Sequence, residues 1–334
     1  MHKAINSVAI NILTELERAG FEAFLVGGSV RDLLLGRKIH DYDITTNATP
    51  DDVKQIFKSV IPFGLEHGTV IVRKNNTSVE VTTYRKKTAD ESFTFAETIE
   101  EDLTFRDFTI NAIAMDRHGN IVDLFDGQTD LKMKTIRAVV DPFARLKEDP
   151  LRMLRAIRFS SQLGFTIEEN TLKAIIELKE KITNVAIERK KDEMTKLLKG
   201  KYFNEAKQYL IQTEIIKHLP IFSDNYTYID ILLKEEKSFF SFSQAITLFN
   251  FYNDEVTVNR WVKAWSCSNK EKKEAQMLLN ALNEYEKKGL TNWLVYELDT
   301  PLYKPFIRLI DTIYKVTVSE NDVREMKKRL SIQS

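Results

Sequence analysis

Short apolar runs alternate with polar turns through the first 130 residues, whereas apolar residues at helical spacing dominate the rest of the chain. Strands have a side-chain period of two residues and helices one of 3.6, so the change of period indicates a change of architecture. The first part predicts, in order, a strand at 21–28, a helix at 30–36, a strand at 42–48, a helix at 49–57, a hairpin at 67–85, and a helix followed by a short strand at 108–127.

Local signals set the limits of several of these elements. The first strand ends in the pair Gly27-Gly28, which is typical of a tight turn. Thr49 precedes Pro50 and two acidic residues, so we expect it to cap the helix that follows. The hairpin has the polar turn KNNTS at its centre.

The helical part begins after Asp141-Pro142. The spacing of its apolar residues predicts helices at 150–165, 170–182, 186–200 and 203–213, and the remainder of the chain is mostly helical. We therefore expect an α+β fold, with a mixed-sheet segment followed by an all-α segment. We also expect the core to contain the three tryptophans, Trp261, Trp265 and Trp293.

Composition excludes several classes of protein. The 334 residues are 43% hydrophobic and suffice for two or three domains, but no apolar run reaches the roughly 18 residues of a membrane span. The single cysteine, Cys267, excludes an intrachain disulfide framework, and the amphipathic N-terminus lacks a signal-peptide cleavage site. Five scattered histidines show no zinc-ligand spacing. We expect a cytoplasmic protein that does not associate with membranes.

The formal net charge of zero hides an uneven distribution of charge. Residues 1–131 carry 14 Lys/Arg against 21 Asp/Glu, residues 132–201 carry 17 against 10, and residues 202–334 carry 18 of each. An acidic first segment beside a basic middle segment fits a protein that holds metal ions next to a polyanion. A chance division between solvated faces would give the same numbers.

Two aspartates two residues apart, Asp41 and Asp43, begin the second predicted strand. Side chains at i and i+2 of a strand point to the same side, so both carboxylates can bind the same Mg²⁺ ions. Glu80 lies between two valines in another predicted strand and is a third candidate. Such metal ions stabilise the attacking and leaving oxygens of a phosphoryl transfer. By itself the D-x-D pattern is weak, because it also occurs in glycosyltransferases and in ordinary loops.

The turn before these aspartates suggests a phosphate site. Gly28 opens a helix directly after a strand, where backbone N–H groups bind phosphate oxygens, and Arg31 can add a bidentate contact. A Walker loop is excluded, because the chain contains no G-x-x-x-x-G-K-[ST] sequence. The combination favours nucleotide chemistry over a plain strand-turn-helix unit.

This combination resembles the nucleotidyltransferase superfamily that includes DNA polymerase β. Five segments extend the resemblance: GGSVRDLLLG with HDYDITTNATP, EEDLTFRDFTINAIAMD, DLFDGQTDL, EDPLRMLRAIRF and AIERKKDEMTKLL. They are similar, in the same order, to the motifs of the class II tRNA nucleotidyltransferases, which include the bacterial CCA-adding enzymes and poly(A) polymerases. The resemblance covers residues 21 to about 200, and beyond them only a helical body is shared.

The resemblance implies a domain organisation and a set of site residues. It divides the chain into a nucleotidyltransferase head at 1–133, a neck with nucleotide-base recognition at 134–200, and a tRNA-binding helical body at 201–334. In the head it implies triphosphate contacts from Gly28 and Arg31, Mg²⁺ ligation by Asp41 and Asp43, phosphate binding by Arg106, and ribose binding by Asp107.

In the neck the resemblance implies that Asp149 and Arg152 read the incoming base, with Arg155 and Arg158 on the same helix face. Cytosine and adenine both present an exocyclic amine beside a ring-nitrogen acceptor, so one carboxylate and one guanidinium can satisfy either base. Guanine and uracil would leave polar groups unpaired. Two plainer interpretations stay open, because Asp149 before Pro150 is also a good helix cap and three arginines spaced by three also fit a solvated ridge.

Two departures from the family pattern bear on the product. Phe105 replaces the first of two arginines that usually precede the aspartate of the second motif. The segment 86–99 is shorter than in CCA-adding relatives and lacks a polar stretch resembling D-H-R-R-P-S. In the family that flexible loop helps to switch the base pocket from CTP to ATP, and relatives without it add two cytidines and stop. We therefore expect a CC-adding enzyme, with complete CCA addition as the alternative.

The expected reaction adds CMP to the 3′ end of tRNA without a nucleic-acid template, using CTP and Mg²⁺ and releasing pyrophosphate. ATP is a further substrate in the complete CCA-adding alternative. A poly(A) polymerase or an inactive tRNA-binding module are the remaining alternatives, and the oligomeric state is open. In the basic middle segment, the residues expected to contact tRNA phosphates are Lys190, Lys191 and Lys196.

Overall fold

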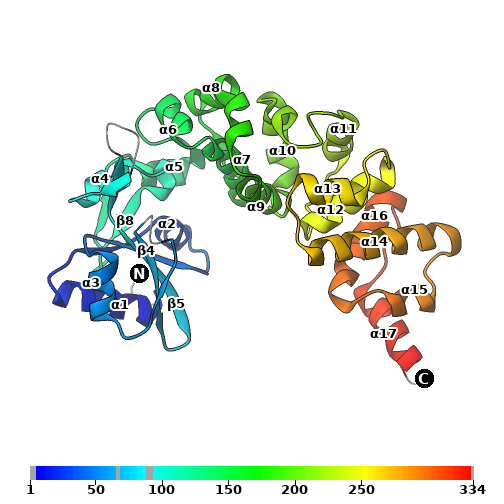
Figure 1. Ribbon diagram of the computed structural model, residues 1–334, viewed down its shortest axis with the longest axis horizontal. Helices are drawn as coiled ribbons and strands as arrows, with labels where there is room; N and C mark the ends of the chain where they lie inside the picture. Colours follow the sequence, from blue (N-terminus) through cyan, green and yellow to red (C-terminus); the bar gives the residue numbers. More distant parts are fainter. Residues whose placement is uncertain (1–4, 65–67, 88–92, 332–334) are drawn as a thin grey trace. The chain divides into compact units, whose positions relative to one another are not determined.

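The protein folds into two compact units, each described here by itself (Figure 1). The structure is a computed structural model that describes residues 5–64, 68–87 and 93–331. The first unit comprises residues 1–148 and 166–171, and the second comprises residues 149–165 and 172–334. The sheet lies in the first unit and the second is built of helices, which confirms the expected α+β fold. The division into head, neck and body stays a prediction, and the first unit extends to Glu148 instead of residue 133.

A mixed sheet of seven strands forms the centre of the first unit, in the order β3-β4-β5-β2-β1-β8-β9. Its strands are β1 (Ala23–Val26), β2 (Tyr42–Thr46), β3 (Val60–Pro62), β4 (Thr69–Lys74), β5 (Thr77–Thr83), β8 (Ile113–Met115) and β9 (Ile121–Asp123). β2 and β5 are parallel, and the other neighbouring pairs are antiparallel. Two small sheets pair β6 (Arg85–Lys87) with β7 (Phe93–Phe95), and β10 (Thr135–Ile136) with β11 (Thr166–Ile167).

Short helices connect these strands. They are α1 (Ser7–Arg18), α2 (Gly28–Leu34), α3 (Pro50–Ile56), α4 (Ile99–Thr104), α5 (Gly127–Met133) and α6 (Pro142–Glu148), with a 3₁₀ turn, η3 (Thr109–Asn111). α1 packs on β1 and β2 through an apolar stripe in which Ile12, Leu13 and Leu16 are fully buried. Burial of this stripe against the sheet stabilises the helix more than its intrinsic propensity does.

The predicted elements around the turn and the aspartates are confirmed as β1, α2, β2 and α3. Thr49 accepts a hydrogen bond from the backbone of Asp52, whose carboxylate accepts one in return from the backbone of Thr49, so a full capping box begins α3. The hairpin of β4 and β5 turns at Asn75 and Asn76, both with positive φ, a conformation that asparagine tolerates well.

The prediction of a helix within residues 108–127 is wrong. Only the single 3₁₀ turn η3 forms there, and β8 follows it and pairs with both β1 and β9. The side chains of Ala112, Ile113, Ala114 and Met115 are fully buried. A continuous apolar run of this length fits a strand buried on both faces as well as a helix, and only the neighbouring strands decide between them.

The second unit contains the four predicted helices at 150–213 and a set of helices that follows them. Its elements are α7 (Leu151–Leu163), α8 (Glu169–Leu178), η4 (Lys179–Asn184), α9 (Ile187–Leu198), α10 (Phe203–Gln212), η5 (Ile215–His218), α11 (Thr227–Lys234), α12 (Phe242–Tyr252), α13 (Val258–Ala264), α14 (Asn269–Lys288), α15 (Asn292–Glu297), η6 (Thr300–Leu302), α16 (Tyr303–Tyr314) and α17 (Glu320–Ser331). The first three residues of α8 belong to the first unit.

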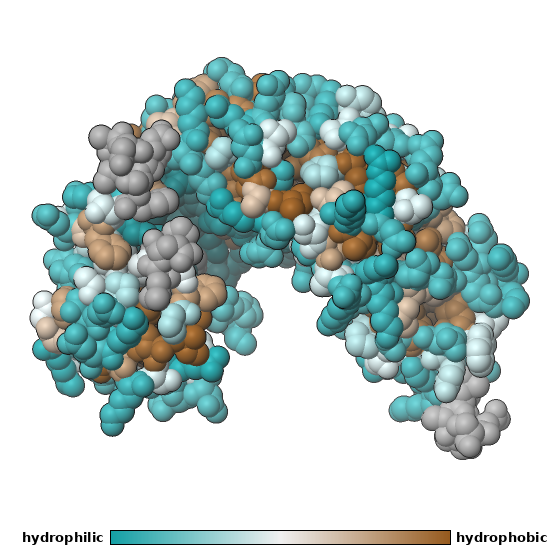
Figure 2. Space-filling view, viewed as in Figure 1, coloured by the Kyte–Doolittle hydropathy of each residue, from teal (hydrophilic) through white to brown (hydrophobic). Residues whose placement is uncertain are grey.

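Aromatic side chains form much of the core of the second unit. Trp261 and Trp265 are fully buried, and Trp261 stacks on Phe249 with ring centroids 5.1 Å apart, so the core prediction is confirmed for these two tryptophans. It is wrong for Trp293, whose side chain is 65% exposed and stacks on Tyr296. Hydrophilic residues cover most of the visible face (Figure 2). Among the residues described, no helix is long and apolar enough to cross a membrane.

Candidate active site

Two acidic side chains of the sheet meet because β2 and β5 are parallel neighbours in fixed register. Asp43 of β2 lies directly opposite Glu80 of β5, and cross-strand partners point to the same face of a sheet. Asp41 precedes β2 and is exposed. The spacing along the chain suggested the pair Asp41 and Asp43, but only the strand order brings Glu80 to them.

The electrostatics of this acidic strand face favour a cation. The pKa of the Asp43 carboxyl is raised to about 6: burial is the largest cause, the negative charges of Glu80 and Asp41 add to it, and the nearby arginines oppose it. Burial is also the main cause of the raised pKa of Glu80. A divalent ion would relieve this repulsion, and carboxylate oxygens are the ligands that Mg²⁺ prefers.

Within the described part of the chain, no group of three histidine, cysteine, aspartate or glutamate side chains is arranged to hold a metal ion. Asp41 and Asp43 therefore stay predicted Mg²⁺ ligands, and Glu80 stays a predicted catalytic carboxylate whose charge acts on Asp43.

The turn between β1 and α2 brings an arginine from a distant segment next to the acidic face. Gly27 has φ of 65°, and a β-carbon placed on it would lie 3.1 Å from Nη1 of Arg106 and 3.7 Å from Oδ2 of Asp43. The positive φ favours glycine here, and a β-carbon would also require the guanidinium of Arg106 to shift by a few tenths of an ångström. The neighbouring Gly28 begins α2, and Arg31 follows it.

Asn111 links two of the predicted nucleotide-binding residues. Arg31 donates a hydrogen bond from Nη1 to Oδ1 of Asn111 at 2.7 Å, and Asn111 donates one from Nδ2 to Oδ1 of Asp107 at 3.0 Å. Arg31 also pairs with Asp32 at 3.0 Å. The amide fixes the orientation of both side chains, because it donates on one side and accepts on the other. Sequence reasoning missed Asn111, although it stands in the quoted segment RDFTINA.

A buried carboxylate that the sequence did not single out holds Arg106. Asp102 of α4 is 2% exposed, and its Oδ2 lies 3.0 Å from Nη2 of Arg106. Ser29 similarly ties α2 to the sheet, because its hydroxyl donates to the carbonyl of Val26 at 2.7 Å. The structure thus brings Gly28, Arg31, Asp43, Glu80 and Arg106 together in one part of the first unit.

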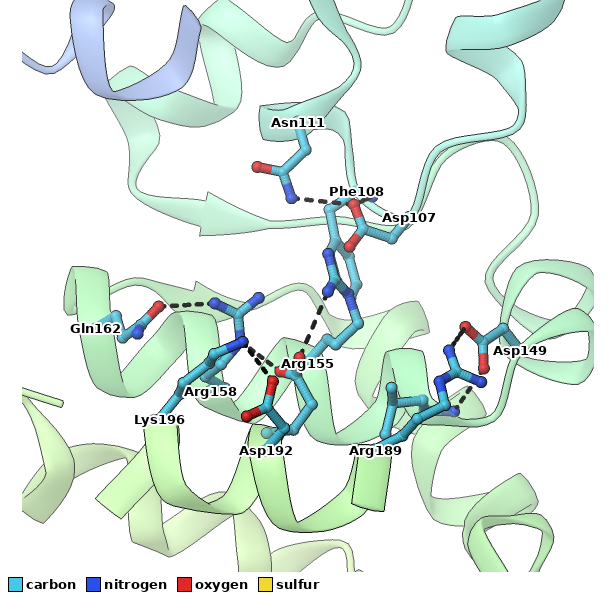
Figure 3. Close-up of polar contacts among 12 residues, drawn as sticks. Asp107, Phe108, Asn111, Asp149, Arg155, Arg158, Gln162, Arg189, Asp192 and Lys196 are labelled. Atoms are coloured by element: carbon cyan, nitrogen blue, oxygen red, sulfur yellow. Dashed lines mark hydrogen bonds and ion pairs between the residues drawn. The ribbon is translucent and has the colours of Figure 1, made fainter. Parts of the chain in front are cut away.

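The other predicted residues lie in the second unit: Arg152, Arg155 and Arg158 are on α7, and Asp149 lies two residues before that helix. Figure 3 shows Asp149, Arg155 and Arg158. Asp149 pairs with Arg189 of α9 at 2.8 Å, and its other oxygen accepts a hydrogen bond from the backbone of Leu151 at 3.2 Å. The capping interpretation thus has structural support, and it leaves the base-reading prediction open, because the Asp149 side chain is 30% exposed.

The arginine ridge is not a solvated face. Arg152 and Arg158 are only 7% and 8% exposed, and Nε of Arg158 lies 2.5 Å from Oε2 of the buried Glu193 of α9. Arg155 lies 3.5 Å from the other oxygen of Glu193. The guanidinium carbon of Arg158 also lies over the ring of Phe159, 3.7 Å from its centroid. Glu193 is a further residue that the spacing within one helix could not reveal.

The lysines expected to contact tRNA differ in exposure. Lys190 is 5% exposed and donates a hydrogen bond to the carbonyl of Thr183, and burial lowers the pKa of its amine. Lys191 pairs with Glu271 at 2.9 Å, whereas Lys196 is 46% exposed. The burial of Lys190 argues against its contacting a tRNA phosphate, and the contacts expected from Lys191 and Lys196 stay predictions.

Both units contain residues that match known protein families. Residues 23–137 match the family described as the poly A polymerase head domain, and residues 164–225 match a family described as a probable RNA- and SrmB-binding site of polymerase A. The CCA-adding enzyme of Oceanobacillus iheyensis is 45% identical over 331 residues, which cover 96% of this chain and 82% of that protein. The CCA-adding enzyme of Levilactobacillus brevis is 38% identical over 86% of this chain and 74% of that protein.

Solved structures agree with the sequence relatives. The crystal structure of the Bacillus stearothermophilus CCA-adding enzyme in complex with CTP matches with a TM-score of 0.86 and 33% identity, over 97% of this chain and 81% of that chain. A tRNA nucleotidyltransferase complexed with a primer tRNA and an incoming ATP analog has a TM-score of 0.70 at 24% identity, over 96% of this chain and 98% of that chain. This second likeness shows a shared fold.

Proposed function

We propose that this chain, which belongs to the class II tRNA nucleotidyltransferases, the family of the CCA-adding enzymes, builds the complete CCA end of tRNA from CTP and ATP. The proposal goes further than the family assignment in naming the product. Relatives named CCA-adding enzyme align with 96% and 86% of this chain, which supports the complete product over the CC product that the short segment at 86–99 suggested. A cytoplasmic location stays a prediction.

The observation that carries the proposed chemistry is the acidic face of β2 and β5 beside an arginine-lined turn. Asp41 and Asp43 would hold Mg²⁺, which when bound activates the 3′ hydroxyl and neutralises the triphosphate. Carboxylates that repel one another, as the raised pKa of Asp43 indicates, fit a divalent cation. Metal-ion dependence is typical of nucleotidyltransferases, and we propose Mg²⁺ as the ion used here.

The chain's own cations would bind and orient the nucleotide. Arg31 and Arg106 supply two guanidinium groups, which suit the phosphate oxygens of CTP or ATP because each can make paired N–H contacts. Asp107 would accept a hydrogen bond from the ribose, and Asn111 holds Asp107 and Arg31 in a fixed relation. Binding in one orientation places the α-phosphate for in-line attack.

Base selection would rest on Asp149 and Arg152. A carboxylate accepts from the exocyclic amine of cytosine or adenine, and a guanidinium donates to the adjacent ring nitrogen. Uracil and guanine present the opposite pattern, so each would leave a polar group of the protein unpaired. In this proposal the Arg189 ion pair positions Asp149 and the helix contact to Leu151 fixes its backbone.

A second candidate, CC addition alone, is favoured by one observation. β6 and β7 pair as a short hairpin with Arg85 opposite Phe95, and five residues, 88–92, join the two strands. The linking residues lie outside the described part of the chain. A hydrogen-bonded hairpin offers less room than a long polar loop for a change in the base pocket between CTP and ATP.

Incubation with tRNA that lacks its 3′ end separates the candidates. CTP alone should add two residues, CTP with ATP should add three, and ATP alone should add none. If the products stop at CC when both nucleotides are present, the enzyme adds CC alone and the proposal of complete CCA addition is wrong. Long adenosine tracts would indicate a poly(A) polymerase, and no incorporation at all would leave only a tRNA-binding module.

A further inference from the structure

Asp102 is a buried carboxylate that joins three segments of the first unit. It lies on α4 with 2% of its side chain exposed. Oδ1 accepts a hydrogen bond from the backbone N–H of Arg85, at the start of β6, at 3.1 Å. Oδ2 accepts one from the hydroxyl of Thr45, two residues after Asp43 on β2, at 3.2 Å. The carboxylate thus touches both the strand that carries Asp43 and the start of β6.

The third partner of Asp102 is the guanidinium of Arg106. Nη2 and Nε of Arg106 donate to Oδ2 at 3.0 Å and 3.3 Å. A buried carboxylate without a cationic partner is strongly unfavourable, so the charge of Asp102 requires Arg106. Thr45 and the Arg85 backbone are neutral donors to different oxygens of Asp102. An asparagine oxygen could accept from the Arg85 backbone while its NH₂ group donates to the Thr45 hydroxyl, which also lies 3.3 Å from the carbonyl oxygen of Thr82.

This pairing determines where the rest of the guanidinium points. Asp102 binds the Nε and Nη2 edge of Arg106, and Nη1 lies over the turn, 3.1 Å from the position that a β-carbon on Gly27 would take. Oδ2 of Asp43 is 3.7 Å from the same position. Arg106 is therefore held beside the acidic strand face before any nucleotide binds. The residue before Arg106 is Phe105, not a second arginine, so this neighbouring position supplies no guanidinium that could take the place of Arg106.

We propose that Asp102 is a positioning residue, which orients Arg106 toward the triphosphate of the incoming nucleotide. The proposal rests on the proposed function, because it takes Arg106 as a triphosphate contact. A purely structural Asp102 would tie α4 to β2 and β6 and would act on stability alone. A positioning Asp102 acts on nucleotide affinity through Arg106. The two roles therefore predict different effects on KM for CTP.

Asp102→Asn separates these roles, because the amide keeps one oxygen acceptor and removes the charge. The variant should raise KM for CTP about tenfold or more, the size expected for a hydrogen bond to a charged group, while kcat changes less than about threefold. The matched control is Glu101→Gln on the same helix. Glu101 pairs with Lys86 and completes the capping box of α4 without touching Arg106, so its KM should stay at the wild-type value.

A double variant tests whether Asp102 acts through Arg106. Asp102→Asn combined with Arg106→Ala should have the KM of Arg106→Ala alone, because a positioned group that is absent cannot be mispositioned. This comparison holds even if Asp102→Asn alone fails to fold, since the double variant contains no unpaired buried charge. Effects that multiply in the double variant, or a wild-type KM in Asp102→Asn, would overturn the positioning role. Wild-type protein that incorporates no nucleotide would instead overturn the proposed function.

Discussion

Asp43 on β2 lies directly opposite Glu80 on the parallel strand β5. The negative charge of Glu80 repels that of Asp43, and this repulsion adds to the effect of burial on the pKa of Asp43, which is about 6. The sheet therefore holds an unfavourable pair that a bound cation would stabilise. Natural proteins retain such pairs where the charge is needed for function.

The stability of the metal-free protein should be lowered by the repulsion between Asp43 and Glu80. The folded pKa of Asp43 lies above its unfolded value, so the folded state binds its proton more tightly and loses stability as pH rises through about 6. Asp43→Asn should therefore raise Tm at pH 8 in EDTA by a few degrees, on the order of 2 kcal/mol, and leave it nearly unchanged at pH 4.

Asp116→Asn is the matched control for this experiment. Asp116 is partly buried, but hydrogen bonds from Asn120 and His118 hold its pKa below the ordinary range. Its ionised form stabilises the fold, so the substitution should lower Tm at pH 8. Equal shifts of Tm in the two variants would contradict the assigned electrostatics.

Loss of either predicted metal ligand should abolish nucleotide incorporation. Asp41→Ala and Asp43→Ala should each lower kcat by at least about 10³-fold in saturating Mg²⁺, with an unchanged circular dichroism spectrum. Asp51→Ala is a suitable control, because Asp51 is exposed on α3 and pairs with Lys54 at the surface. Wild-type rates in either ligand variant would exclude the metal assignment.

A side chain at Gly27 should interfere with the arginine-lined turn. Gly27→Ala places a β-carbon 3.1 Å from Nη1 of Arg106 and forces a backbone conformation that alanine rarely adopts. We expect KM for CTP to rise about tenfold and Tm to fall by several degrees. Gly36→Ala provides a comparison, since Gly36 also has positive φ but has open space around it. A fall in Tm with unchanged KM would show that backbone strain alone matters.

The two interpretations of Asp149 predict different effects of replacing it. If Asp149 reads the base, Asp149→Ala should raise misincorporation of UMP and GMP about 10- to 100-fold. Arg189→Ala removes the ion pair and keeps the carboxylate, so its effect on base discrimination should be smaller. If Asp149 serves only as a helix cap, Tm should fall and nucleotide preference should stay the same.

Exposed lysines of the basic segment should contribute to tRNA binding. Lys196→Gln together with Lys199→Gln should weaken binding to all tRNAs alike and reduce the slope of log K against log salt. Lys190→Gln should chiefly affect stability, because its amine is buried against the carbonyl of Thr183. A loss of affinity confined to one tRNA sequence would contradict a contact with the phosphate backbone.

Local signals in the sequence determined much of the fold. The glycine pair, the cap at Thr49 and the asparagine turn each specify a backbone conformation within a few residues, and the structure has β1, α3 and the β4–β5 hairpin where they were predicted. The ordered motifs likewise identified the family, because five segments in one order are unlikely to coincide by chance. The prediction of a helix within 108–127 was wrong. Because β8 is buried on both faces, its sequence lacks the alternation of apolar and polar residues by which a strand is recognised.

Only the tertiary structure decided which side chains meet. The parallel register of β2 and β5 brings Glu80 to Asp43, the turn at Gly27 makes room for Arg106, and the burial of α4 makes Asp102 its partner. α9 likewise supplies Arg189 to Asp149 and Glu193 to Arg158. Apart from the Asp102–Arg106 pair, whose residues are four positions apart, these contacts join residues far apart in the chain. Their distances depend on strand order and packing, which no local pattern of residues encodes.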